Sequence, residues 1–215
     1  ETGLQWSPYP AESRALTAAL LHSQGRLGEA YDLLDVTGQR PPMVYEWLYY
    51  AQQTGLWVLS GHLVTDAFEQ IAPHWSSDGL IAIHAGSAEM RLAERLGDHA
   101  RAHATYDRIV ATVGPLWHEW FAARLRLSTM ALAAYSAAAP DQSAEERATS
   151  VEATRRLLAD GGRVIERYAG LDDTLGPEYH AWVRRREAEG LRWRWLAQID
   201  PPEEDVLLAA WRDAV

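Results

Sequence analysis

Histidine pairs are the residues of this sequence that come closest to a metal-binding pattern. His99 and His103 stand four positions apart and share one face of a helix, the spacing of two metal ligands, with Asp98 and Asp107 nearby. No third ligand follows at a defined spacing, and His118 lacks the second histidine of a zinc-protease motif. We therefore interpret His99 and His103 as part of a solvated helix face and expect no metal.

Nucleophilic and redox chemistry find little support in the residue types. The sequence contains no cysteine, which excludes a thiolate nucleophile, a disulfide and a cysteine-bound metal. It also contains no lysine, so a glycine-rich phosphate-binding loop with its lysine is excluded. No nucleophile, base and orienting group stand at a spacing that supports catalysis. We expect a protein that is not an enzyme and has no cofactor, with a stand-alone enzyme as a distant alternative.

Aromatic residues form the most unusual local composition, between residues 45 and 57. Tyr45 and Tyr49 fall on one face of the expected helix, whereas Trp47 and Tyr50 fall on another, and Trp57 follows. One neighbouring helix cannot bury all of these rings. They therefore either fill the core or line a groove for a small molecule or a partner helix, and both interpretations stay open.

A second cluster of candidate binding residues combines tryptophan with arginine near the C-terminus: Trp182, Arg185, Arg186, Glu189, Trp193 and Trp195. Arg185 and Glu189 are an i,i+4 pair, and an arginine over a tryptophan ring adds a cation-π contact. A solvated, salt-bridged face explains the charges, whereas contact with a partner explains the tryptophans. Trp182, Arg185 and Trp193 are the residues expected to make that contact.

Composition and charge narrow the class of protein. An apolar share of 47%, with ten Trp and nine Tyr, supplies a substantial core and excludes a disordered chain. The net charge of -10, with charges mixed along the helices, argues against direct nucleic-acid contact. The apolar stretches are far shorter than the roughly 20 residues of a membrane span. With no secretory signal on the chain as given, we expect a cytoplasmic protein.

The elements that must position these residues are all helical. Apolar residues recur at helical spacing, Gly and Pro separate the periodic stretches, and no stretch alternates as a strand would. The sequence predicts about nine or ten helices, over 11–24, 27–37, 44–53, 56–71, 79–96, 99–113, 117–138, 145–168, 178–198 and from 203 to the end. Asp98 and Ser143 with Glu146 are predicted N-caps, the latter pair as a capping box.

Short turns make successive helices antiparallel, and repeated pairs bury one face of each against the next. We therefore expect an all-α fold in which antiparallel helix pairs stack as an α-solenoid. Residues 11–215 are expected to form a single helical domain after an N-terminal extension, 1–10, whose Glu1, Thr2 and Gly3 are interpreted as a cloning remnant. We also expect the sequence to be a piece of a longer chain.

Two of the turns resemble each other and the second half of a tetratricopeptide repeat. In 25–34 and 97–106, a turn glycine is followed five residues later by Ala30 or Ala102 and then by Leu34 or Tyr106. In tetratricopeptide repeats the small residue lets paired helices approach and the large one fills the groove between them. This resemblance implies a tetratricopeptide-like solenoid.

The run 176–189, GPEYHAWVRRREAE, together with 211–215, WRDAV, resembles the helical region of large ATP-binding LuxR-type transcription regulators from high-GC bacteria. The resemblance implies a longer protein with a nucleotide-binding domain and a DNA-binding domain outside this sequence. It also implies that the present segment mediates protein-protein interaction or self-association, or alternatively senses a small-molecule effector. No nucleotide-binding or DNA-reading residue of that family lies in this segment.

Overall fold

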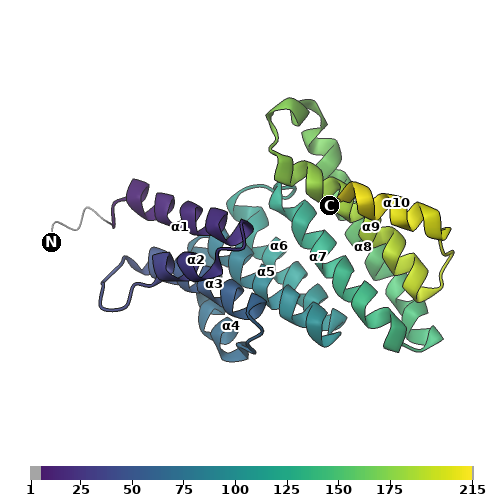
Figure 1. Cartoon of the computed structure of the whole chain (residues 1–215), viewed down its shortest axis with the longest axis horizontal. Coiled ribbons are helices and arrows are strands. Elements are labelled where there is room, and N and C mark those ends of the chain that lie inside the picture. Colours follow the sequence, from purple (N-terminus) through teal and green to yellow (C-terminus); the bar gives the residue numbers. More distant parts are fainter. Residues whose placement is uncertain (1–5, 215) are drawn as a thin grey trace. The chain divides into compact units, whose positions relative to one another are not determined.

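The computed structural model of the chain describes residues 6–214, and within that range it contains ten α-helices and no strand. This confirms the predicted all-helical class. The helices are labelled in Figure 1: α1 Pro8–Ser23, α2 Leu27–Leu34, α3 Met43–Leu59, α4 Thr65–Ile71, α5 Gly79–Leu96, α6 His99–Leu116, α7 Ala123–Ala138, α8 Ala144–Tyr168, α9 Pro177–Ala197 and α10 Glu204–Ala214. No helix in this described range has the length and apolarity needed to cross a membrane. The expected remnant, residues 1–3, lies outside the described residues.

The chain separates into two compact units, Glu1–Glu89 and Met90–Val215, and α5 contributes to both. The sequence predicted one continuous domain over 11–215, and the division falls in the middle of the fifth helix of that range.

In the first unit, α1 packs against α2 and α3 through small side chains. Ala11, Ala15 and Ala18 are its buried residues, and they recur at the spacing of one helix face. Alanine at the contact lets the helix backbones approach closely, as the expected helix pairing requires. α3 in turn contacts α2, α4 and the 3-10 segment η2, Ala72–Ser77.

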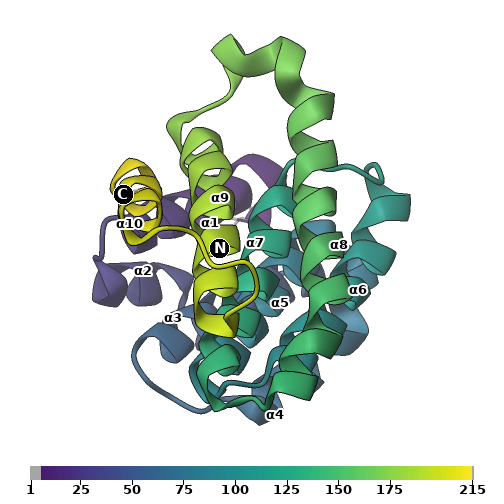
Figure 2. The same cartoon turned by 90° about the vertical axis from the view of Figure 1, so that its right-hand side faces the viewer.

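In the second unit, α7 is the central helix and packs against α6, α8 and α9. Its buried residues are distributed around the whole helix and are mostly small, such as Ala131, Ala133, Ala134 and Ser136. A helix surrounded on all sides needs apolar or satisfied side chains on every face, which explains why α7 lacks a polar stripe. Figure 2 shows α8 and α9 beside each other, joined at one end by the 3-10 segment η4, Ala169–Thr174.

Several helix ends follow the predicted local signals. Gly25 and Gly97 adopt positive φ angles of 75° and 68° in the two similar turns, where side-chain-bearing residues are disfavoured. The Asp98 carboxylate accepts a hydrogen bond from the backbone N–H of Arg101 at 3.0 Å. The capping box of Ser143 and Glu146 is formed in both directions at the start of α8. These predictions are confirmed.

Several predicted helix boundaries are wrong. α2 ends at Leu34 rather than at Thr37, and α6 continues past Val113 to Leu116. The helix break expected at Gly55 does not occur, because α3 continues to Leu59 and ends where Gly61 adopts a φ of 93°. A helix interior tolerates glycine at a cost of about 1 kcal/mol, whereas the left-handed conformation after the helix strongly favours it. The helix expected from Trp117 begins only at Ala123, since residues 117–122 form a turn in which Trp120 N–H donates to His118 Nδ1.

Two consecutive glycines in α8 form a notch for a side chain of α9. The Arg186 guanidinium donates to the Leu158 carbonyl oxygen from Nε at 3.0 Å and from Nη2 at 2.6 Å. A Cβ atom on Gly161 would lie 2.8 Å from Arg186 Cδ and 3.1 Å from Ser128 Oγ, and one on Gly162 would lie 3.2 Å from Arg186 Nη2. The glycines therefore keep space for the guanidinium against the α8 backbone.

We predict that Gly161→Ala destabilises the protein despite the higher helix propensity of alanine. The added Cβ displaces Arg186 from Leu158, and the loss of charge-assisted hydrogen bonds, about 1.5–3 kcal/mol, exceeds the propensity gain of about 1 kcal/mol. Urea denaturation measures the free energy of unfolding. In an Arg186→Ala background, which removes the side-chain atoms beyond Cβ that the new methyl group would meet, the same alanine should become stabilising, and an unchanged sign there would contradict the proposed notch.

Candidate functional site

A buried ion pair joins three helices of the second unit. Arg124 Nη2 on α7 and the Tyr106 hydroxyl on α6 both donate to Asp160 Oδ2 on α8, each at 2.8 Å. Arg124 also donates to the Tyr106 oxygen at 3.0 Å and to the Glu119 carbonyl at 2.8 Å. The side chains of Arg124 and Asp160 are only 6% and 7% exposed, so each charge depends on the other for compensation. Burial raises the pKa of Tyr106, which keeps its hydroxyl protonated.

The same network fixes the turn before α7. Arg124 Cζ lies 4.0 Å from the ring centroid of Trp120, and Arg163 Cζ lies 5.1 Å from it. Two guanidinium groups therefore contact one indole ring, an arrangement stabilised by cation-π attraction. This contact positions the turn against α8 and indicates a structural role for the network.

His99 and His103 lie in a half-buried cluster, and their interpretation as a solvated helix face is wrong. His103 Nδ1 lies 3.0 Å from the Tyr135 hydroxyl, and its side chain is 16% exposed. The His99 ring packs against Tyr135 with a centroid distance of 4.8 Å. Arg156 donates to Asp107 at 2.6 Å and lies 3.4 Å from His103. The described residues contain no group of three side chains suited to hold a metal ion.

In the first unit, the candidate aromatic residues on α3 contact one another and neighbouring segments. Tyr49 is fully buried, and its hydroxyl donates to the Ala11 carbonyl at 2.9 Å. Tyr45 lies 6.4 Å from Tyr49 between ring centroids, and Tyr50 lies 5.7 Å from Trp57. These rings have intramolecular partners, which supports the core interpretation of the cluster. As binding residues, Tyr45, Tyr49, Tyr50 and Trp57 stay predictions.

Trp47, the remaining aromatic residue of the α3 cluster, stacks on His74. Their ring centroids are 3.9 Å apart and their planes differ by 12°. Trp47 also contacts Tyr50 edge to face at 5.9 Å. The stack connects α3 to η2 within the first unit, and His74 is a residue that the aromatic pattern of the sequence did not indicate.

The C-terminal cluster separates into a core residue and a surface group. Trp193 is 4% exposed and belongs to the core of the second unit, where its indole N–H has no hydrogen-bond partner among the described residues. Trp182 and Arg185 are half-exposed on α9, with Arg185 Cζ 5.3 Å from the Trp182 ring centroid. Of the three residues expected to contact a partner, the structure therefore brings together Trp182 and Arg185.

Arginines from other helices join this surface group, which we call the arginine cluster: Arg91 on α5, Arg126 on α7 and Arg185 on α9. Arg126 Nη1 donates to Glu178 Oε1 at 3.4 Å, and Trp182 Nε1 donates to the same oxygen at 3.4 Å. Burial, followed by the nearby charges of Arg126 and Arg185, lowers the pKa of Arg91. Neither Arg91 nor Arg126 was predicted from the sequence. The available signal for Arg126 was that it and Arg124 are the charged residues of the largely apolar stretch 123–138.

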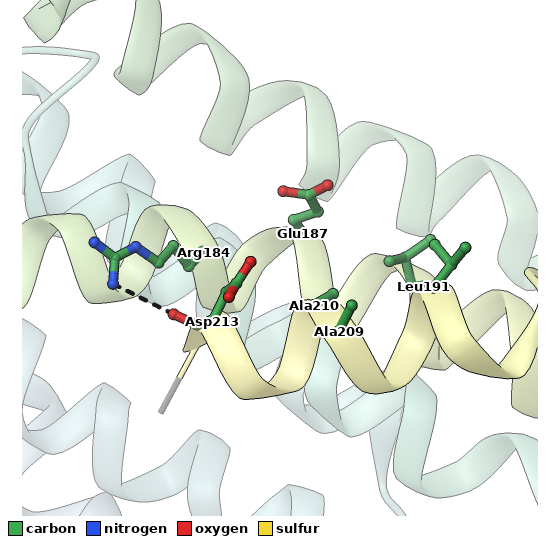
Figure 3. Close-up of a pocket in the computed structure, with 7 residues that line it drawn as sticks. Arg184, Glu187, Leu191, Ala209, Ala210 and Asp213 are labelled. Carbon is green, nitrogen blue, oxygen red and sulfur yellow. Dashed lines mark hydrogen bonds between the residues drawn. The ribbon is translucent and has the colours of Figure 1, made fainter.

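A groove of about 440 Å³ lies between α9 and α10. Figure 3 shows Arg184 at one end, where it donates to the Asp213 carbonyl at 3.3 Å, and Leu191 at the other. Ala209 and Ala210 present small side chains from α10. The remaining lining residues are Glu187 and Val206. This mixed lining suits another polypeptide better than an apolar small molecule, because the groove combines small apolar side chains with a charged rim.

α10 leaves most of its surface uncovered. None of its residues is fully buried, and Val206 and Leu208 are 51% and 44% exposed. Asp205, Leu208, Ala209 and Arg212 are all exposed and share one face, at spacings of three, four and seven residues. An exposed apolar strip with opposite charges at its two ends is typical of a helix that contacts another helix.

Comparison with protein-family models, curated proteins and solved structures finds no match to this chain.

We predict that Arg124→Met lowers the free energy of unfolding by roughly 3–5 kcal/mol, because the Asp160 carboxylate stays buried without its counter-charge. Arg155→Met is the matched control: Arg155 is 66% exposed and pairs with Glu152 at the surface of α8, so its loss should cost less than about 0.5 kcal/mol. Adding Asp160→Leu to Arg124→Met should recover part of the loss. Equal effects of the two arginine substitutions would contradict a structural ion pair.

The His103 environment predicts a pH dependence of stability. Burial lowers the pKa of His103 from its ordinary value of 6.5, so the unfolded chain takes up this proton more readily than the folded chain. The contribution of His103 is complete above about pH 6.5 and is lost as the pH falls toward the folded-state pKa. His103→Gln should therefore flatten the decline between pH 7 and 5 in urea denaturation, whereas His62→Gln, at an exposed position, should not. A steeper decline in the His103 variant would overturn this assignment.

Proposed function

We propose that this chain is a non-catalytic helical module that associates with a second copy of itself through α10. The observation that carries this proposal is the uncovered face of α10, with Leu208 and Ala209 between Asp205 and Arg212. Arg212 and Asp205 have no ion-pair partner among the described residues. Both charges and the apolar pair are thus available to another molecule.

The order of these residues suits a two-fold antiparallel contact. If two α10 helices meet antiparallel between Leu208 and Ala209, Leu208 faces Ala209 of the second copy and Asp205 faces its Arg212. Both ion pairs then form, because the same surface on both subunits is self-complementary under two-fold symmetry. The antiparallel arrangement also places the positive end of each helix dipole beside the negative end of the other.

The wider setting of the module is part of the same proposal. The resemblance of 176–189 and 211–215 to the helical region of ATP-binding LuxR-type regulators supports a place in a bacterial transcription regulator. The similar turns at 25–34 and 97–106 support a tetratricopeptide-like arrangement of the helix pairs. Non-catalytic character is supported by the engagement of the buried ionisable groups, such as Asp160 and Glu189, with arginine side chains.

A small-molecule effector-sensing module is the second candidate function. The arginine cluster favours it, because arginines from three helices lie near enough to influence one another and both Arg185 and Trp182 are half-exposed. The α3 rings provide weaker support, since they pack on one another. An effector sensor and a self-associating module are compatible within one regulator.

Sedimentation velocity over a dilution series tests self-association, and we predict a reversible dimer. Asp205→Arg and Arg212→Asp should each weaken it by about tenfold or more, because like charges then face each other across the two-fold axis. The double variant Asp205→Arg/Arg212→Asp restores opposite charges and should restore the dimer. Arg155→Glu, a charge reversal on α8, is the matched control and should leave the dimer unchanged.

Two results would overturn the proposal. A strictly monomeric wild-type chain at high concentration removes self-association altogether. A dimer that persists in both single variants and is unaffected by Leu208→Glu places the contact on another face. Circular dichroism of each variant checks that α10 and the rest of the chain remain helical.

A further inference from the structure

The arginine cluster has more hydrogen-bond donors than the protein satisfies. Arg126 Nε and Arg185 Nε are both buried and have no hydrogen-bond partner among the described residues. Arg91 makes no hydrogen bond or ion pair within that part of the chain. Buried donors usually find a partner, and guanidinium groups do so most strongly with oxyanions. The unsatisfied donors point to an anionic ligand.

The carboxylates of the chain pair weakly with the cluster. Arg126 and Trp182 reach the Glu178 carboxylate at 3.4 Å, and Arg185 reaches Glu189 at 3.4 Å. Charge-assisted N–H···O bonds are normally about 2.7–2.9 Å long, so these contacts are loose. The chain therefore balances only part of the guanidinium charge and makes no strong bond to these groups.

The local balance of charge remains positive. The cluster arginines and Arg192 lie near the carboxylates Glu94, Glu178 and Glu189. Glu189 is fully buried, and burial raises its pKa, which weakens its contribution of negative charge. A chain with a net charge of -10 thus concentrates cations at one place on α5, α7 and α9.

The Glu178 carboxylate can be displaced from the arginine cluster by another anion. Its side chain is 74% exposed and lies in the first turn of α9, yet its Oε1 accepts from both Arg126 and Trp182. Moving it into solvent would cost little, since exposed ion pairs contribute about 0–1 kcal/mol. An external oxyanion could then take the same donors.

We propose that Arg126, Arg185 and Trp182 bind the phosphate group of a small molecule in place of the Glu178 carboxylate, with Arg91 as an additional cation. Phosphate is the group indicated because its three terminal oxygens and double charge match several guanidinium donors, whereas one carboxylate offers two oxygens and a single charge. This site does not depend on self-association through α10, although it supplies the ligand chemistry for the effector-sensing candidate.

Isothermal titration calorimetry at constant ionic strength tests the site with inorganic phosphate, phenyl phosphate and succinate. We expect both phosphates to bind. Arg126→Gln and Arg185→Gln should each weaken binding by about tenfold or more, the loss expected for a charge-assisted hydrogen bond. Glu178→Gln should strengthen binding by about two- to fivefold, because it removes the competing carboxylate. Stronger binding cannot result from a folding defect, so this variant separates ligand contact from structural damage.

Matched controls on α8 carry the same changes in charge: Arg155→Gln for the arginine variants and Glu152→Gln for Glu178→Gln, at an exposed surface pair. Neither should alter binding. No binding of either phosphate at about 10 mM, well above a weak dissociation constant of 1 mM, would overturn the site. Binding of succinate but of neither phosphate would show that the site prefers a carboxylate ligand and would overturn the proposal. Equal effects of Glu178→Gln and Glu152→Gln on binding would show that the phosphates respond only to the net charge of the protein, which would also overturn it. Phenyl phosphate binding tighter than inorganic phosphate would identify an organic phosphate as the source.

Discussion

The buried contact of Arg124 with Asp160 is the interaction on which the second unit depends. It joins α7 to α8 directly and α6 through the Tyr106 hydroxyl, so three helices share one charged network. A buried ion pair tolerates few alternative geometries, because any displacement leaves a charge without compensation. The apolar side chains of α7 are mostly small and similar, so their packing alone would allow several positions of the neighbouring helices. The ion pair selects one of these positions.

α9 is placed on this scaffold by its own polar contact. Arg186 enters the notch at Gly161 and Gly162 and donates to the Leu158 carbonyl, two residues before Asp160 on α8. On the same helix, Trp182 donates to Glu178, which also accepts from Arg126, and Arg185 lies over the Trp182 ring. The arginine cluster therefore depends on two features that do not themselves contact the proposed ligand: the buried ion pair and the glycine notch.

Local sequence signals predicted the elements well and the site poorly. Glycines in turns, the Asp98 cap and the Ser143 capping box act within a few residues, so their effects can be recognised in sequence. Gly55 was misinterpreted because a glycine inside a helix and a glycine after one look alike until the chain geometry is known. The partners Arg124 and Asp160 are 36 positions apart, and no periodicity shows that they meet.

The candidate binding residues also show that contacts between different helices could not be predicted from the sequence. Trp182 and Arg185 were recognised because they lie on one helix, three residues apart, whereas Arg126 comes from another helix and depends on packing to reach them. Trp193 shares the helix and the residue type of Trp182 but points into the core. Spacing along a helix defines a face, and only the neighbouring helices decide whether that face is covered.

The glycine notch also limits how this unit can change shape. Two packed helices can move by sliding along their axes or by turning together, and sliding by one helical turn shifts contacts by about 5.4 Å. Such a slide would take Arg186 away from Gly161 and Gly162 and press it against residues that carry side chains. The notch therefore holds α8 and α9 in one register. If a ligand at the arginine cluster shifts α9, we expect α8 to move with it as part of one rigid body.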